Sequence, residues 1–284
     1  MDNASLYACA NCLQKRDASR ALEEFLPRMT WGSDEMVLDV GCGPGDVTAE
    51  VLLPKLPSDV SHVVGLDLSA SMVRHAADRY RSHKKLTFAQ SDISAAYNTA
   101  ALDVPGRAFS KLFSFYCLHW VQDQRGAMHS ICRLLSPGGE ALLVFLAGGP
   151  IFKLWEKMAK NPKWTDYMQD ISRFISPYQH CADPAAEFYN LLAEFGLEVL
   201  HCSCRDETFM FDTMESLKKQ IEAVTPFLER MPVELRASFI EDCMDEVVKL
   251  GLIQNNNNNG KDRVNTRYLL LIAHARKPAL DTRL

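Results

Sequence analysis

The sequence predicts an α/β protein built on a doubly wound, mostly parallel sheet of seven strands. Two observations lead to this expectation. From residue 36 onward, short β-rich runs alternate with amphipathic helical patterns, and a glycine-rich turn follows the first run. With 284 residues, of which 47% are hydrophobic, the chain can bury one large core. We therefore expect a single domain that covers residues 1–284.

Seven apolar or β-branched runs are expected to form the strands. They lie at residues 36–40, 62–66, 86–90, 111–116, 140–146, 197–204 and 268–275. Helices are expected between them at 47–53, 70–80 and 124–135. The last of these helices should end at Ser136-Pro137-Gly138-Gly139, because proline and glycine stop a helix and turn the chain.

Further helices are expected outside this alternating core. Apolar residues recur at helical spacing from Leu6 to Phe25, with an interruption at 15–17, which predicts two short helices. Two long helical stretches, 151–174 and 214–253, exceed a simple connection in a compact domain. We expect them to form lids over a pocket, as insertions at about 151–183 and 207–262. The asparagine run 255–259 is expected to be a surface loop.

Charge and composition exclude several classes of function. The formal net charge is −5 and no basic run is present, so neither nucleic acid nor an anionic membrane is an expected partner. No apolar run approaches the roughly 20 residues of a membrane span. The nine cysteines and the absence of a secretory signal predict reduced thiols in the cytoplasm. Neither cysteine pair, Cys9/Cys12 or Cys202/Cys204, is followed by a second pair of ligands at the spacing of a zinc site, so no metal is expected.

The strongest motif follows the first expected strand. It reads Asp39-Val40-Gly41-Cys42-Gly43-Pro44-Gly45, a strand that runs into three glycines before a helix. Glycine lets the main chain turn sharply and lets a ligand approach the backbone. The next strand ends at Asp67, where a carboxylate can accept hydrogen bonds from both hydroxyls of a ribose. Together these features predict a nucleoside-containing cofactor.

The glycine spacing decides between two such cofactors. A nicotinamide dinucleotide site requires its third glycine at the position of Asp46, where a carboxylate would also repel the pyrophosphate. A sulfonium cofactor has no phosphate and is positively charged, so Asp39 and Asp46 suit it. After the third strand, Asp92 offers a carboxylate to an adenine amino group and Ile93 an apolar face to its ring.

These motifs resemble, in order and spacing, those of the class I S-adenosylmethionine-dependent methyltransferases. The resemblance implies a Rossmann-like fold and S-adenosyl-L-methionine as the cofactor. The residues expected to hold it are Asp39, Gly41, Cys42, Gly43, Gly45, Asp67, Leu68, Asp92, Ile93, Ser114 and Phe115. The alternative is that 41–45 is only a tight strand-to-helix turn.

The end of the fourth strand is expected to border the methyl acceptor. Transfer of a methyl group from a sulfonium to a carboxylate joins opposite charges, so a dry apolar pocket favours it and no base is required. The indole of Trp120 and the amide of Gln14 are neutral donors that can orient such a carboxylate. Alternatively, Trp120 packs in the core and Gln14 is solvated. His119 is either a base for a hydroxyl or amine acceptor or a buried structural histidine.

Segments spread over nearly the whole chain carry a closer resemblance: Leu6-Tyr7, Asn11, Gln14, Arg16-Asp17, 39–43, 113–124, 136–139, 143–146, 174–178 and 226–228. They are similar to the corresponding segments of the juvenile hormone acid O-methyltransferases of insects. The resemblance implies a sesquiterpenoid acid as substrate, juvenile hormone acid or farnesoic acid, with its carboxylate held by Gln14 and Trp120. Two alternatives remain: an enzyme for another lipophilic acid, and a non-catalytic protein that binds S-adenosylmethionine.

Overall fold

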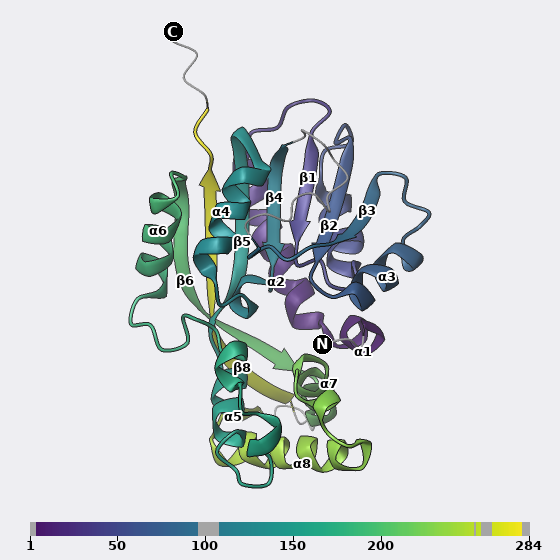
Figure 1. Ribbon diagram of the computed structural model, residues 1–284, viewed down its shortest axis with the longest axis vertical. Helices are drawn as coiled ribbons and strands as arrows, with labels where there is room; N and C mark the ends of the chain where they lie inside the picture. The colour runs from purple at the N-terminus through teal and green to yellow at the C-terminus, as the bar shows by residue number, and fades with distance from the viewer. Residues whose placement is uncertain (1–3, 96–107, 253, 257–262, 280–284) are drawn as a thin grey trace.

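A computed structural model describes residues 4–95, 108–252, 254–256 and 263–279 (Figure 1). Its strands form one sheet in the order β3-β2-β1-β4-β5-β8-β6, and the short strand β7 pairs with β8. Strands β1 to β5 pair with one another in parallel, whereas β8 is antiparallel to both β5 and β6. The strands are β1 (Met36–Val40), β2 (His62–Asp67), β3 (Leu86–Gln90), β4 (Phe109–Phe115), β5 (Leu135–Gly148), β6 (Glu198–Phe211), β7 (Gln254–Asn256) and β8 (Arg263–Arg276). The predicted fold class and all seven predicted strands are confirmed.

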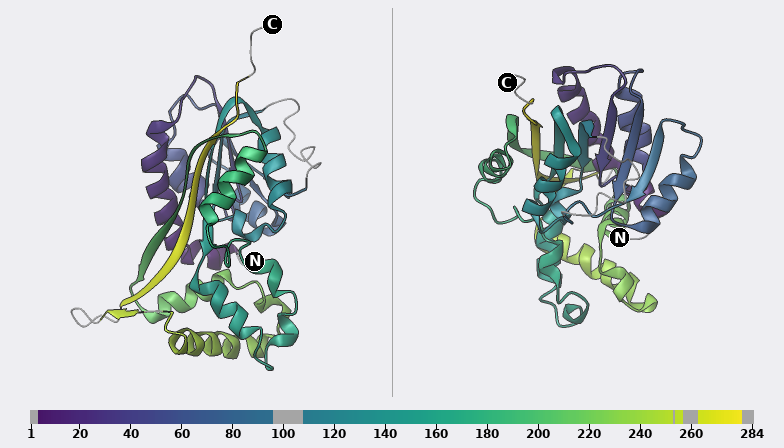
Figure 2. Two further views of the ribbon diagram at one scale, coloured as in Figure 1. Left: turned by 90° about the vertical axis from the view of Figure 1, so that its left-hand side faces the viewer. Right: turned by 45° about the horizontal axis from the view of Figure 1, so that its top comes forward.

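Helices cover both faces of the sheet (Figure 2). Side chains alternate between the faces along each strand, so Val37 and Leu142 pack with α2 and η2, whereas Leu38 and Leu143 pack with α4 and α6. The sheet is therefore doubly wound. The helical elements around the sheet are α1 (Ala4–Ala10), α2 (Cys12–Phe25), η1 (Leu26–Arg28), η2 (Val47–Leu52), η3 (Leu53–Lys55), α3 (Ala70–Arg79), η5 (Leu118–Trp120), α4 (Gln124–Leu134) and α6 (Pro184–Glu194).

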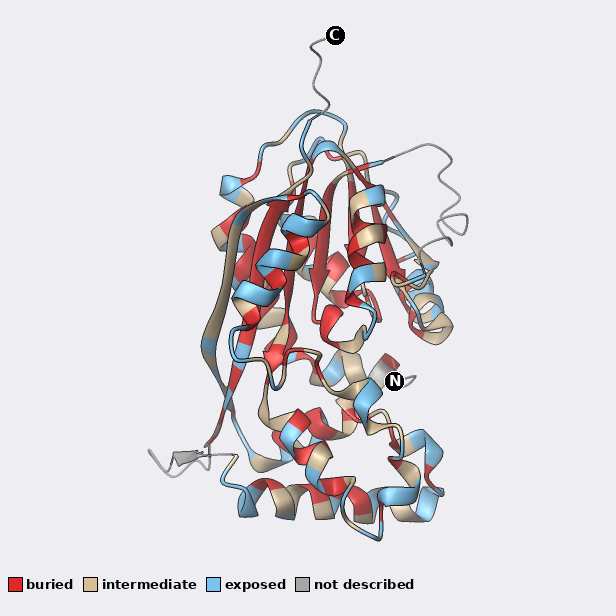
Figure 3. Ribbon diagram, turned by 60° about the vertical axis from the view of Figure 1, so that its left-hand side comes forward, coloured by how far each residue is buried: buried red, intermediate tan, exposed pale blue. Residues whose placement is uncertain are grey.

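A second group of helices lies beyond the carboxyl ends of the parallel strands, at the bottom of Figure 1. These are α5 (Pro150–Met158), η6 (Thr165–Tyr167), η7 (Ile171–Phe174), α7 (Met214–Val224), η8 (Leu228–Arg230) and α8 (Val233–Lys249). Strands β6 and β8 reach this group because their pairing continues from Glu207↔Tyr268 to Phe211↔Val264, past the end of β5. Figure 3 shows buried residues along the strands and also within the helical group, whose interior includes Trp155 and Phe239.

Two local predictions were wrong. The break between the first two helices lies at Asn11, not at 15–17. Lys15 lies within α2, and its ammonium group reaches Asp46 (2.8 Å) and Glu50 (2.9 Å). The expected asparagine loop begins as a strand, since Asn255 and Asn256 belong to β7 and pair with β8. The other three asparagines lie outside the described residues.

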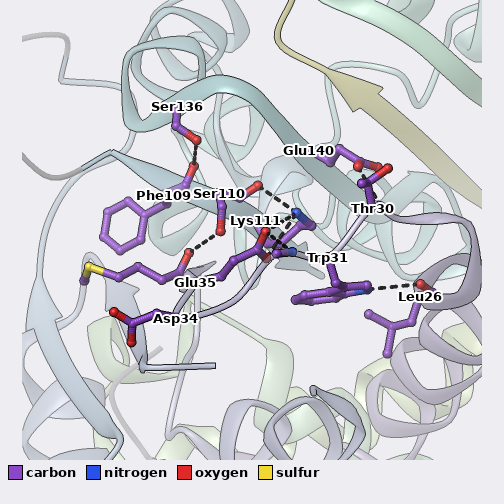
Figure 4. A network of polar contacts seen from close by, with 12 residues as sticks. Leu26, Thr30, Trp31, Asp34, Glu35, Phe109, Ser110, Lys111, Ser136 and Glu140 are labelled. Carbon is purple, nitrogen blue, oxygen red and sulfur yellow. Dashed lines mark hydrogen bonds and ion pairs between the residues drawn. The ribbon is translucent and has the colours of Figure 1, made fainter. Parts of the chain in front are cut away.

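At the amino ends of the strands, buried charges have structural partners (Figure 4). The Lys111 ammonium group lies 3.2 Å from the Glu35 carboxylate and 5.0 Å from the centre of the Trp31 ring. Glu140 accepts a hydrogen bond of 2.9 Å from the main-chain amide of Thr30. These contacts fasten the segment before β1 to β4 and β5, so this edge serves stability.

Within the described ranges, no helix is long and apolar enough to cross a membrane. In the same part of the chain, the acidic, histidine and cysteine side chains form no group of three or more that could hold a metal ion.

Candidate active site

The glycine-rich turn lies between β1 and η2, at the carboxyl edge of the sheet. Gly41 and Gly43 have φ angles of 78° and 53°, a region that side chains rarely adopt. A β-carbon on Gly41 would lie 2.2 Å from Cβ of Cys117, whereas one on Gly43 would have Tyr7, at 3.9 Å, as its nearest neighbour. Gly45 packs against α3 and β3. Of the three glycines, Gly43 thus has open space beside its backbone.

Asp67 ends β2 next to this turn. One carboxylate oxygen accepts the amide of Gly43 and the other the amide of Ser69, each at 2.9 Å. These bonds fix the direction of the Asp67 carboxylate, a group that can accept hydrogen bonds from ribose hydroxyls. The adjacent Leu68 side chain is 65% exposed. A fixed carboxylate beside an exposed apolar surface fits the ribose and adenine of a nucleoside.

A cleft beside the turn, here called the cofactor cleft, has an acidic character. Its lining includes Asp39 and Asp46 and contains neither lysine nor arginine. Asp39 is buried, accepts a hydrogen bond of 2.6 Å from Thr48, and has its pKa raised to about 7 by that burial. Asp46 accepts a hydrogen bond of 2.7 Å from Asn11 and pairs with Lys15. The residues present therefore fit a cationic sulfonium better than a pyrophosphate. The lining residues are Tyr7, Gln14, Asp39, Gly41, Cys42, Gly43, Asp46, Val47, Phe115 and Tyr116.

The remaining residues expected at the cofactor lie in different surroundings. Phe115 lines the cofactor cleft, but the hydroxyl of Ser114 donates to the carbonyl of Val40 at 2.9 Å and so links β4 to β1. Asp92 follows β3, and one of its oxygens accepts the amide and the hydroxyl of Ser94. Ile93 is buried in the core on the side of α4.

A second cavity, here called the apolar chamber, contains all three residues expected at the acceptor site: Gln14, His119 and Trp120. Most of its wall is apolar, and the largest contributions come from α5 and α7, two of the helices that the sequence predicts to be lids, with Val247 from α8. The chamber and the cofactor cleft share Tyr7, Gln14 and Tyr116. The apolar side chains in its wall include Leu146, Ile151, Phe152, Leu154, Phe211, Leu217, Ile221, Val224, Val247 and Leu252.

His119 is enclosed by aromatic rings and is 2% exposed. Its ring centre lies 4.9 Å from that of Trp120 and 5.9 Å from that of Tyr116. Burial lowers the pKa of His119 to about 3, so the imidazole is uncharged at neutral pH and is a weak base. This disfavours an acceptor that must first lose a proton to His119.

The floor of the chamber, formed by Tyr116 and Tyr268, is built on Asp17, for which no role was predicted from the sequence. The hydroxyls of Tyr116 and Tyr268 each donate to the same Asp17 oxygen at 2.5 Å, and Arg16 pairs with the other oxygen at 2.7 Å. Tyr116 has a φ angle of 57°, which is uncommon for a residue with a side chain. The signal in the sequence was an acidic residue inside the apolar stripe of α2, between Leu13 and Ala21.

Comparison with known proteins agrees with this geometry. Residues 13–202 match a family model described as a methyltransferase domain. The YcgJ protein of Bacillus subtilis shares the fold, with a TM-score of 0.56 and 18% sequence identity, over 91% of this chain and 98% of that one.

Two relatives extend the match to nearly the full chain. The juvenile hormone acid O-methyltransferase of Drosophila melanogaster is 39% identical over 98% of this chain and 93% of its own length. That of Bombyx mori is 34% identical over 99% of both chains. The expected family and cofactor are thereby confirmed: the chain belongs to the juvenile hormone acid O-methyltransferases, a family of S-adenosylmethionine-dependent methyltransferases.

Proposed function

We propose that the protein transfers a methyl group from S-adenosylmethionine to the carboxylate of a sesquiterpenoid acid, juvenile hormone acid or farnesoic acid, in juvenile hormone biosynthesis. The observation that supports this best is the junction of the cofactor cleft and the apolar chamber at Tyr7, Gln14 and Tyr116. A lipophilic acid with its tail in the chamber would present its carboxylate at this junction. The names of the two relatives support the same class of acid.

The cofactor cleft is suited to the methyl donor. When bound, S-adenosylmethionine supplies an electrophilic methyl group on a positively charged sulfur. Asp67 would accept hydrogen bonds from the ribose, Asp92 from the adenine amino group, and Gly43 would let the methionine part approach the backbone. The carboxyl groups of Asp39 and Asp46 line this cleft, and a bound cation would favour the ionised form of Asp39, whose pKa burial raises to about 7.

Gln14 is placed to hold the acceptor carboxylate. The amide NH₂ of Gln14 donates a hydrogen bond to the hydroxyl of Tyr7. The buried carbonyl oxygen of Gln14 has no hydrogen-bond partner among the described residues. The two ends of an amide group are interchangeable in such an assignment. With the amide turned over, Tyr7 donates to the carbonyl and the freed NH₂ donates to a carboxylate. Trp120 supplies a second neutral donor from the same chamber.

Neutral donors and an apolar wall suit this reaction. A carboxylate is ionised at neutral pH and needs no base. In the chamber it is stripped of most of its water, which raises its reactivity toward a cationic methyl donor. Gln14 and Trp120 fix its direction without neutralising its charge, so the protein contributes alignment and desolvation.

Replacement of Trp120 with phenylalanine is expected to lower kcat/KM for farnesoic acid about tenfold or more, because the ring is kept but a donor to the carboxylate is lost. Steady-state kinetics at saturating cofactor measure this. Trp31→Phe, at the opposite edge of the sheet, is the matched control. Full activity of Trp120→Phe would mean that Trp120 only packs in the chamber and does not donate a hydrogen bond to the carboxylate.

The rate is expected to depend little on pH. At saturating acid and cofactor, kcat should be constant between about pH 6 and 9, because the carboxylate is already ionised, His119 stays uncharged, and the bound cation would lower the pKa of Asp39 from its cofactor-free value of about 7. Initial rates in buffers of equal ionic strength measure the profile. A rise in kcat with a midpoint near the ordinary pKa of histidine, about 6.5, would show that a base takes part.

The proposal also covers the domain organisation, the location and the partners of the protein. We infer one domain over residues 1–284 in which the insertions at about 151–183 and 207–262 act as lids, since α5, α7 and α8 wall the chamber. We also infer a cytoplasmic enzyme, which is supported by nine cysteines that are free thiols in the described chain. Its partner would be a small lipophilic acid, and nucleic acid would not bind.

A panel of acids tests the proposed function. Turnover of farnesoic acid and juvenile hormone acid should exceed that of a straight-chain fatty acid and of benzoic acid. Faster transfer to one of the latter two would favour an enzyme for another lipophilic acid. Cofactor binding without transfer to any acid would favour a non-catalytic protein.

A further inference from the structure

Tyr116 lies at the junction of the cofactor cleft and the apolar chamber, and its backbone is strained. It lines both cavities. Its φ angle of 57° is in the left-handed region, which is costly for a residue with a β-carbon. Such a conformation persists only where surrounding contacts hold it, and it is found most often at functional sites. The strain at Tyr116 therefore points to a role in the reaction.

Two hydrogen bonds hold Tyr116 in this conformation. Its main-chain amide donates to the carbonyl of Val144 in β5 at 2.8 Å, and its hydroxyl donates to Asp17 in α2 at 2.5 Å. Asp17 is 2% exposed and Tyr116 is 6% exposed, so water competes little for the second bond. The other carboxylate oxygen of Asp17 pairs with Arg16 at 2.7 Å, which fixes the direction of the carboxylate. Tyr116 thus connects the sheet to α2.

The helix that holds the Tyr116 hydroxyl also carries Gln14, one of the two donors proposed for the acceptor carboxylate. Gln14 and Asp17 are three positions apart and both are buried, so they lie on the same face of α2. The hydrogen bond from Tyr116 to Asp17 is therefore made on the face of α2 that presents Gln14 to the chamber.

The chain that follows Tyr116 carries Trp120, the second proposed donor. It turns at once, because the main-chain amide of Trp120 donates to the carbonyl of Cys117 at 2.9 Å. The ring of His119 packs against both aromatic neighbours, with its centre 5.9 Å from that of Tyr116 and 4.9 Å from that of Trp120. The position of Trp120 therefore depends on where Tyr116 is held.

We propose that Tyr116 is a positioning residue for methyl transfer. Through its bond to Asp17, it holds the turn that carries Trp120 in a fixed position relative to Gln14, so that both donors can bind one carboxylate beside the cofactor cleft. The inference rests on the proposed function. Transfer requires the acceptor oxygen in line with the methyl group, so a small displacement of one donor lowers the rate steeply.

Tyr116→Phe tests this role, because it removes the hydroxyl and keeps the ring. It is expected to lower kcat about tenfold at saturating farnesoic acid and cofactor, while the Kd of S-adenosylhomocysteine changes less than about twofold. A double-mutant cycle with Trp120→Phe separates positioning from a general loss of structure. Because Tyr116 acts through Trp120, Tyr116→Phe should change kcat less than about twofold in the Trp120→Phe background. Equal losses in both backgrounds would overturn the inference.

Tyr268→Phe is the matched control. The Tyr268 hydroxyl donates to the same Asp17 oxygen at the same distance, 2.5 Å, and it also accepts a hydrogen bond from Arg16. Tyr268 belongs to β8 and does not line the cofactor cleft. Its replacement should lower the free energy of unfolding at least as much as Tyr116→Phe does, but it should lower kcat much less. Equal losses of kcat in the two variants would contradict a positioning role for Tyr116.

Asp17→Asn provides the test if Tyr116→Phe does not fold. Asparagine keeps an acceptor oxygen in the same shape but lacks the charge, so it weakens the hydrogen bond from Tyr116 without removing it. The value of kcat should fall, and the loss should again disappear in the Trp120→Phe background; a loss that persists there would overturn the inference. Absence of methyl transfer to any acid by the unmodified protein would instead contradict the proposed function.

Discussion

Replacement of Asp67 with alanine is expected to weaken binding of S-adenosylmethionine about a hundredfold. The carboxylate would accept the ribose hydroxyls and already fixes the amides of Gly43 and Ser69 at 2.9 Å. Hydrogen bonds to a charged group contribute about 1.5–3 kcal/mol each, and about 1.4 kcal/mol corresponds to a tenfold change in affinity. Isothermal titration calorimetry with S-adenosylhomocysteine measures the loss.

Asp78→Ala is the control for this variant. Asp78 is an exposed aspartate on α3, so its removal changes the net charge equally but should leave cofactor affinity as it is. Unchanged affinity in Asp67→Ala would contradict the ribose contact assigned to that carboxylate.

Replacement of Asp17 with alanine is expected to lower the free energy of unfolding by about 3–5 kcal/mol, the usual cost of removing one partner from a buried ion pair. Asp17 is the shared acceptor of the Tyr116 and Tyr268 hydroxyls and pairs with Arg16. Its removal leaves these groups without their acceptor. Urea unfolding followed by circular dichroism measures the change.

The pair Asp206–Arg267 provides a contrast on the same sheet. Its side chains are 54% and 67% exposed, so Asp206→Ala should cost less than about 1 kcal/mol. A comparably small loss in Asp17→Ala would mean that the floor of the chamber does not depend on this carboxylate.

The strands could be predicted where local pattern and neighbouring turns agree. The bounds of β1 and β3 match the prediction at both ends, because each is a short apolar run closed by polar or turn residues. Strands β6 and β8 are longer than expected because they pair with each other beyond the sheet, and that extension depends on a partner far away in sequence.

Those parts of the candidate site that depend on a local sequence motif could be predicted. The position of Asp67 beside the glycine turn follows from the order of parallel strands. The left-handed backbone of Tyr116 and the unpartnered indole of Trp155 do not follow from any local pattern. An apolar stripe predicts that one helix face is buried, but it does not distinguish a packed core from the wall of a chamber.

The meeting of cofactor cleft and apolar chamber is best tested by a crystal structure with S-adenosylhomocysteine and farnesoic acid bound. We predict that the carboxylate lies at the junction, within hydrogen-bond distance of Gln14 and Trp120, with the tail among α5, α7 and α8. A carboxylate bound away from Gln14 and Trp120, or a tail outside the chamber, would contradict the proposal.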